Sequence, residues 1–303
     1  MKKLTGIFPA LLTPFDVKGR IHEESLGKLV QVLLNKGVDG FYVCGSTGEA
    51  FLLSLEERKR VLSIVMEEVK GRAAVICHVG AIATHFSLKL AQHAAKLGVD
   101  AISSIPPFYY KLSQAEILGY YNDLADVGVP LIPYNFPTLS GVTLTKEMVR
   151  ELRKHENVIG IKFTSSDMYQ LERMKNTDPG LLVYNGFDEM FLSGLAMGAD
   201  GAIGSTFNFM PEKFLSIQNL FAQGDLEDAR AEQASANAVI DALLMTGKLL
   251  NAQKYLINLQ GIPFGECRKP FEPLTEMDKK LLEQVWRQHI MNNGKSRREA
   301  HVH

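Results

Sequence analysis

Short, almost continuously apolar runs alternate with amphipathic stretches along the first two thirds of the chain. Such runs are typical of strands buried on both faces, because a half-exposed strand would alternate apolar and polar residues. Eight runs are present, and they cover residues 6–12, 40–44, 74–79, 101–105, 131–135, 158–163, 181–185 and 201–203. We therefore predict eight buried strands.

The stretches between these runs predict helices with one apolar face. Ser54 lies three residues before Glu57 at the start of one stretch, which predicts a capping box. Gly37, Gly98 and Gly198 follow the ends of three others, where glycine readily takes the left-handed conformation that ends a helix. The links from helix to next strand are short, and this predicts parallel strands joined by right-handed crossovers.

Eight such units close most naturally into an α/β (β/α)8 barrel, or TIM barrel, with a doubly wound sheet as the alternative. After Asn208 the strand pattern stops, and helical patterns follow at residues 211–221, 226–244, 248–259 and 277–291. One of these supplies the eighth barrel helix, and the others form a C-terminal helical extension. We divide the chain into a catalytic barrel (1–225), a C-terminal helical region (226–295) and a disordered tail (296–303).

Composition narrows the class of protein. The chain has 303 residues, of which 46% are hydrophobic, and its 33 basic and 34 acidic side chains give a net charge of −1. A chain of this length can bury a large core without disulfides or a metal. The balanced charge argues against nucleic-acid binding. No run approaches about 18 uninterrupted apolar residues, so we expect no membrane span.

The cysteines indicate a reducing compartment. Cys44, Cys77 and Cys267 are odd in number and form no C-x-x-C pair, which argues against a disulfide framework and a zinc site. We therefore expect a cytoplasmic protein with no metal and no cofactor.

A lysine inside an apolar run is the first candidate for chemistry. Lys162 lies in the sixth run, where an ammonium group has no inexpensive environment. Either the side chain reaches the barrel mouth or an ion-pair partner, or its amine has a lowered pKa and attacks a carbonyl to form a Schiff base.

Polar motifs follow other runs, at the strand ends where barrel enzymes place their active sites. The sequence Gly-Ser46-Thr47-Gly-Glu after the second run can bind a small anion through amide and hydroxyl groups, or can be a structural turn. Tyr134 ends the fifth run and either relays a proton or packs with its hydroxyl bonded. Further motifs follow the seventh and eighth runs: Gly186, Asp188 and Glu189, which can bind sugar hydroxyls or cap a helix, and Ser205.

Together these motifs resemble the pyruvate-dependent class I aldolases of the N-acetylneuraminate lyase and dihydrodipicolinate synthase superfamily. The resemblance covers nearly the whole chain. Within the superfamily the sequence is similar to the lyase branch, on the supporting segments 107–110, 139–142, 162–165, 186–189 and 204–206.

The resemblance implies reversible cleavage of N-acetylneuraminate to N-acetylmannosamine and pyruvate, in a cytoplasmic homotetramer without a cofactor. Lys162 would form the Schiff base and Tyr134 would shuttle the proton. The remaining implied contacts are with the pyruvyl carboxylate (Ser46 and Thr47), with the sugar end (Thr164, Gly186, Asp188, Glu189 and Ser205), and with the neighbouring subunit's site (Tyr109).

Three positions depart from the patterns of the superfamily. Leu139 stands where the synthase branch has an arginine that pairs with a second carboxylate, which argues against that branch. Cys44 stands where a glycine is usual, and Pro106 where a threonine is usual.

Two alternatives to the lyase reaction stay open: an aldolase for another 2-keto-3-deoxy sugar acid, and a non-catalytic barrel that binds a sugar acid.

Overall fold

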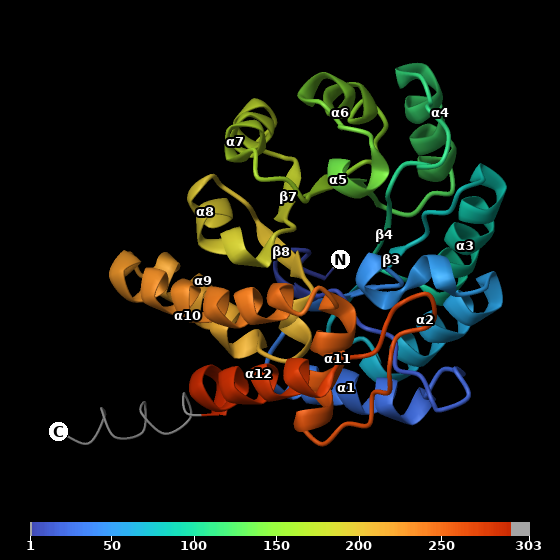
Figure 1. Cartoon of the computed structure of the whole chain (residues 1–303). Coiled ribbons are helices and arrows are strands. Elements are labelled where there is room, and N and C mark those ends of the chain that lie inside the picture. The colour runs from blue at the N-terminus through green and yellow to red at the C-terminus, as the bar shows by residue number, and fades with distance from the viewer. Residues whose placement is uncertain (1, 292–303) are drawn as a thin grey trace.

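A computed structural model describes residues 2–291, and its central feature is a ring of parallel strands surrounded by helices (Figure 1). The strands are Gly6–Pro9 (β1), Gly40–Val43 (β2), Ala74–His78 (β3), Ala101–Ser104 (β4), Leu131–Asn135 (β5), Gly160–Phe163 (β6), Leu182–Asn185 (β7) and Gly201–Gly204 (β8). All eight predicted strands are present.

The strands pair in parallel in the order β1-β8-β7-β6-β5-β4-β3-β2. In the registers that matter for the site, Tyr134 on β5 lies opposite Lys162 on β6, and Lys162 lies opposite Tyr184 on β7. The seam between β1 and β2 is joined where the backbone N–H of Leu11 donates to the carbonyl of Tyr42 at 2.9 Å. The predicted (β/α)8 barrel is therefore confirmed.

The helices between the strands follow one another around the ring (Figure 1). They are Glu23–Asn35 (α1), Leu55–Val69 (α2), Thr84–Leu97 (α3), Gln114–Ala125 (α4), Pro137–Ser140 (α5), Lys146–Leu152 (α6), Met168–Thr177 (α7), Phe191–Ala196 (α8) and Pro211–Ala222 (α9). Ser54 and Glu57 form the predicted capping box of α2. Gly37, Gly98 and Gly198 have positive φ angles, as expected for helix ends.

Apolar side chains form two cores. One lies between the strands and the surrounding helices. The other fills the barrel interior and contains Leu4, Phe8, Ala10, Tyr42, Ala74, Ile76, Ala101, Ile105, Ile132, Tyr134, Tyr184 and Ile203. Because successive side chains of a strand point to opposite faces, Lys162 points into the interior with Tyr134 and Tyr184.

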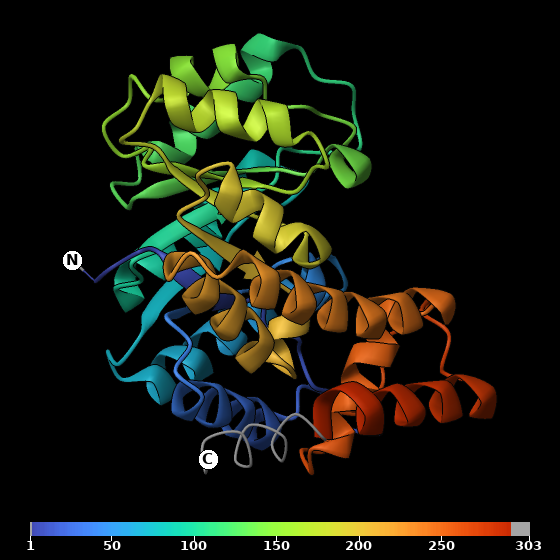
Figure 2. The same ribbon diagram turned by 90° about the vertical axis from the view of Figure 1, so that its left-hand side faces the viewer.

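The C-terminal helices lie beside α8 and α9, on one side of the barrel (Figure 1). After α9, which takes the place of the eighth barrel helix, come Leu226–Met245 (α10), Leu249–Leu259 (α11), Glu276–Trp286 (α12) and a π-helical turn, Arg287–Met291 (η5). In Figure 2 they lie on the right, on the side away from the N-terminus. The predicted boundary at residue 225 falls between α9 and α10 and stays a prediction, while the predicted tail at 296–303 lies outside the described residues.

Across residues 2–291, the helices are all too short or too polar to cross a membrane.

Candidate active site

Lys162 is buried in the barrel interior, and it lies against two aromatic rings. Its side chain is on β6, the residue is 5% exposed, and its Nζ lies 4.1 Å from the ring centroid of Tyr134 and 4.3 Å from that of Tyr42. Burial lowers the pKa of Lys162 to about 7, although the nearby carboxylate of Asp188 acts to raise it. Near neutral pH a large fraction of this amine is therefore uncharged and nucleophilic.

Tyr134 places a phenol beside this amine. Burial raises its pKa well above the usual range, while the hydroxyls of Thr164 and Ser46 act in the opposite direction. The Ser46 Oγ and Thr164 Oγ1 atoms are buried, and in the described part of the chain they have no hydrogen-bond partner besides the Tyr134 hydroxyl. Buried hydroxyls in this state can bond to a ligand that enters the barrel mouth.

The turn after β2 brings Ser46 and Thr47 to the barrel mouth. Residues Ser46–Gly48 form one turn of 3₁₀ helix (η1) between Cys44 and Glu49, which have left-handed φ angles of 59° and 57°. Most side chains disfavour this conformation. The usual glycine at the Cys44 position thus has a physical explanation, because glycine adopts this φ without strain.

Asp188 is the buried carboxylate of the site. It begins a 3₁₀ turn after β7, Asp188–Met190 (η3), and its Oδ2 accepts hydrogen bonds from the backbone N–H of Thr206 at 2.8 Å and from the Thr206 hydroxyl at 2.7 Å. Burial raises the pKa of Asp188 to about 6 despite these bonds. The neighbouring Glu189 is exposed.

Gly186 allows the loops after β6 and β7 to approach each other. A Cβ atom at this position would lie 1.8 Å from Thr164 Oγ1, so only glycine fits beside that hydroxyl. The loop after β8 contributes Ser205, whose Oγ accepts a hydrogen bond from Gln253 Nε2 on α11 at 2.9 Å. Thr164, Gly186, Asp188 and Ser205 therefore follow three neighbouring strands at the same end of the barrel.

Tyr109 differs from the other predicted site residues because it projects outward. It is 75% exposed in the loop after β4, and its ring contacts that of Tyr110 edge-on at 5.1 Å between centroids. In the same loop, Phe108 contacts Phe51, which follows the turn that carries Ser46.

Two residues near Lys162, Tyr42 and His78, have no counterpart in the sequence analysis. Tyr42 lies under the amine, and its ring lies 6.1 Å from that of His78. His78 accepts the backbone N–H of Ile105 at Nε2 and donates from Nδ1 to the carbonyl of Cys44. Burial, together with the Arg58 charge, lowers the pKa of His78 well below its usual range, so this histidine is neutral. The sequence feature that could have identified them is an aromatic or polar residue at a strand position that points into the barrel interior.

Comparison with known proteins places this barrel in a family. Residues 3–289 match the model of the dihydrodipicolinate synthetase family. The chain belongs to the dihydrodipicolinate synthetase family. It is 51% identical over 278 residues to the N-acetylneuraminate lyase of Rhizobium meliloti (strain 1021), covering 91% of this chain and 92% of that protein.

Two solved structures of this family have the same architecture. One is CdNal from Clostridium difficile in complex with mannosamine, with a TM-score of 0.92 and 38% identity over 95% of this chain and all of the other. The other is a catalytic lysine mutant of the Ruminococcus gnavus sialic acid aldolase, with a TM-score of 0.94 and 34% identity over 97% of this chain and 99% of the other.

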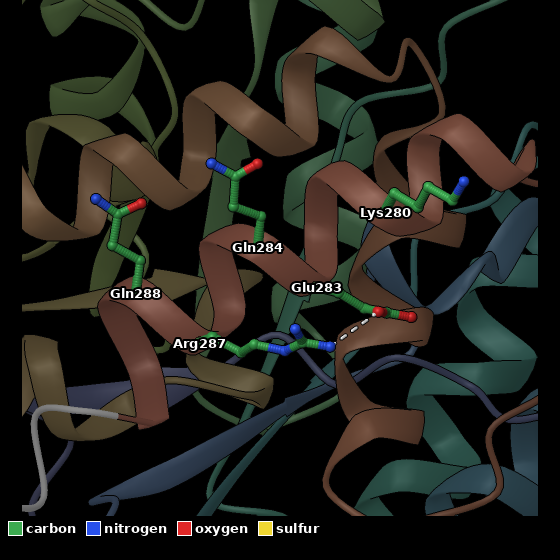
Figure 3. Close-up of a pocket in the computed structure, with 5 residues that line it drawn as sticks. All are labelled: Lys280, Glu283, Gln284, Arg287 and Gln288. Atoms are coloured by element: carbon green, nitrogen blue, oxygen red, sulfur yellow. Dashed lines mark hydrogen bonds and ion pairs between the residues drawn. The ribbon is translucent and has the colours of Figure 1, made fainter.

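A hollow of about 540 Å³ lies elsewhere, on the surface of α12 and η5 (Figure 3). It is lined by Lys280, Glu283, Gln284, Arg287 and Gln288. Its lining comes from a single stretch of helix and shares no residue with the barrel mouth.

Among residues 2–291, no three His, Cys, Asp or Glu side chains are arranged to hold a metal ion.

Proposed function

We propose that this protein is a class I aldolase that reversibly cleaves N-acetylneuraminate to N-acetylmannosamine and pyruvate. One observation carries the proposal: a buried lysine amine with a pKa of about 7 lies 4.1 Å from the ring of a buried tyrosine. The family membership and the lyase relatives support the choice of reaction.

The first step is Schiff-base formation. The uncharged Lys162 Nζ attacks the C2 ketone of the open-chain sugar acid, and loss of water leaves a protonated imine. A lowered pKa increases the fraction of attacking amine at neutral pH. The rings of Tyr42 and Tyr134 then face the positive charge of the imine, an arrangement that stabilises a cation.

The second step breaks the C3–C4 bond. When the imine forms, Tyr134 gives its phenol proton to the hydroxyl that leaves as water. The resulting tyrosinate removes the proton from the C4 hydroxyl, the C4 oxygen becomes an aldehyde, and the bonding electrons pass to C3 and into the imine, which gives an enamine. The positive charge of the imine favours the tyrosinate and so offsets the raised pKa of Tyr134. N-acetylmannosamine leaves; protonation at C3 and hydrolysis then release pyruvate and the free amine.

The two ends of the substrate contact different loops in this proposal. The pyruvyl carboxylate accepts hydrogen bonds from the hydroxyls of Ser46 and Thr47 on η1. The Tyr134 hydroxyl is the only other hydrogen-bond partner of Ser46 Oγ in the described residues. The hydroxyl-rich end contacts the loops after β6, β7 and β8, through Thr164, Gly186, Asp188, Glu189 and Ser205.

The outward side chains set the specificity and the assembly that we propose. Leu139, which is 57% exposed on α5, offers no guanidinium for a second carboxylate, and this favours the lyase reaction over the synthase reaction.

Exposed aromatic side chains are enriched at subunit contacts, and we propose that Tyr109 enters a neighbouring site in a homotetramer. The cysteines are all thiols, which fits a cytoplasmic enzyme.

Trapping with borohydride tests this function. Incubation with N-acetylneuraminate and borohydride should leave a pyruvate-derived mass adduct on Lys162, and the Lys162→Met variant should acquire none. In a parallel assay the enzyme should release N-acetylmannosamine faster than it cleaves shorter 2-keto-3-deoxy sugar acids. An adduct with preference for the shorter acids would assign a different aldolase. Binding of pyruvate without an adduct would instead indicate a non-catalytic barrel.

A further inference from the structure

Glu49 ends the turn that carries Ser46 and Thr47, and it is 3% exposed. The backbone N–H of Glu49 donates to the Ser46 carbonyl at 3.1 Å. A displacement of Glu49 would therefore also displace Ser46 and Thr47, which we assign above to the pyruvyl carboxylate.

The carboxylate of Glu49 is held by the C-terminal part of the chain. Its Oε1 lies 2.6 Å from Lys254 Nζ on α11, and both side chains of this ion pair are completely buried. Its Oε2 accepts the backbone N–H of Arg268 at 2.9 Å. The turn after β2 is thus fixed by groups from outside the eight strand–helix units.

Lys254 is itself fixed in place. Its Nζ donates to the carbonyl of Glu266 at 3.2 Å and lies 4.3 Å from the ring centroid of Phe15. An ammonium with several fixed partners is a rigid anchor, because little freedom remains for it to lose when the substrate binds.

The turn requires such an anchor. Cys44 and Glu49 flank it with φ angles of 59° and 57°, a strained conformation for side chains other than glycine. Strained residues keep their geometry only where the surroundings hold them there. The hydrogen bonds from the Arg268 N–H to Glu49 and from Thr13 Oγ1 to the Gly48 carbonyl also hold the turn. Loss of the ion pair removes the only salt-bridge partner of Glu49 among the described residues, and we expect the turn then to shift from the position that the carboxylate of the substrate needs.

We propose that Lys254 is a positioning residue that acts through Glu49 to hold the carboxylate-binding turn, so that α11 is part of the functional unit. This inference rests on the proposed function. It predicts that loss of the ion pair weakens binding of the pyruvate carboxylate, while the chemistry at Lys162 is retained.

Pyruvate-dependent borohydride trapping of the full-length protein separates affinity from reactivity. In the Lys254→Met variant we expect the half-saturating pyruvate concentration to rise about tenfold, since small misplacements of binding groups are costly. The trapping rate at saturating pyruvate should change by less than about threefold. Lys175→Met is the matched control: it breaks the Lys175–Asp200 ion pair of 2.8 Å near the opposite strand ends and should leave half-saturation unchanged.

The double variant E49Q/K254M removes both charges and so avoids an unpaired buried ion. We expect its melting temperature to recover toward that of the wild type, while its half-saturating pyruvate concentration stays raised. Recovery of both quantities would assign the ion pair a purely structural role and overturn the inference. If the wild type itself traps no pyruvate, the proposed function fails instead.

Discussion

Lys162 illustrates a conflict between stability and reactivity at the scale of a single residue. Its pKa falls from 10.5 to about 7 because folding removes the amine from water. Unfolding therefore takes up a proton at any pH between these two values, and the free energy of unfolding rises with pH there by up to about 1.4 kcal/mol per unit. Below pH 7 the destabilisation is complete, of the order of 5 kcal/mol.

Lys162→Met should therefore stabilise the protein although it abolishes the Schiff base. We expect the free energy of unfolding at pH 6 to rise by roughly 2–5 kcal/mol, because an apolar side chain replaces a desolvated amine. The gain should shrink as the pH rises from 7 toward 10.5, where the unfolded lysine also becomes neutral. Urea denaturation of both proteins at pH 6 and pH 9 measures this; a variant that is less stable at pH 6 would contradict the prediction.

At the scale of elements, the C-terminal helices contact several of the loops that form the barrel mouth. Besides Lys254, Gln253 of α11 donates to Ser205 Oγ, and Gln233 of α10 donates to the carbonyl of Asp188 at 3.1 Å. The helical region that we assign to residues 226–295 thus contacts the loops after β2, β7 and β8. We propose that this region supports the site and does not form an independent unit.

Gln253→Leu tests this support at the sugar end. The change removes the hydrogen bond to Ser205, and one such bond contributes about 0.5–1.5 kcal/mol. We expect KM for N-acetylneuraminate to rise roughly two- to tenfold. The half-saturating pyruvate concentration in borohydride trapping should stay constant, since the variant leaves η1 intact.

Gln260→Leu, at the C-terminal end of the same helix, is the matched control. Gln260 donates to the carbonyl of Phe209 at 2.7 Å and has no contact with Ser205. Its loss should cost stability without changing KM. Equal KM values in the two variants would assign the effect of Gln253 to stability alone.

At the scale of the whole molecule, exposed aromatic side chains lie in a loop beside the barrel mouth. Tyr109 and Tyr110 are 75% and 70% exposed, and they lie in the loop next to Phe51 and Phe108. In the homotetramer that we propose, these rings would lie against a neighbouring copy of the chain. The complete site in our proposal therefore contains a residue from a second copy of the chain.

Mixed assemblies test this arrangement. Tyr109→Ala should lower kcat/KM by about tenfold if the ring closes a neighbouring site. Co-assembly with the inactive Lys162→Met protein supplies an intact Tyr109 to sites that retain Lys162, so activity should increase above that of Tyr109→Ala alone. Light scattering must show that both proteins are tetramers; mixed tetramers without a gain in activity would contradict the shared site.

The sequence by itself determined the fold of the described residues and the identity of most candidate site residues. Buried parallel strands are recognisable because runs such as 131–135 and 158–163 are apolar on both faces, and Gly37 marks a helix end because glycine tolerates positive φ. Lys162 stood out because a lysine in such a run is physically costly.

Only the tertiary structure decided which residues surround that lysine and what holds them. Tyr42 and His78 are neighbours of the site because barrel closure brings β2 and β3 to face β6 across the interior. Glu49 and Lys254 are distant in sequence, and neither has a local pattern that predicts their buried ion pair. Sequence periodicity reports local burial, but contacts between distant segments depend on how the whole chain packs.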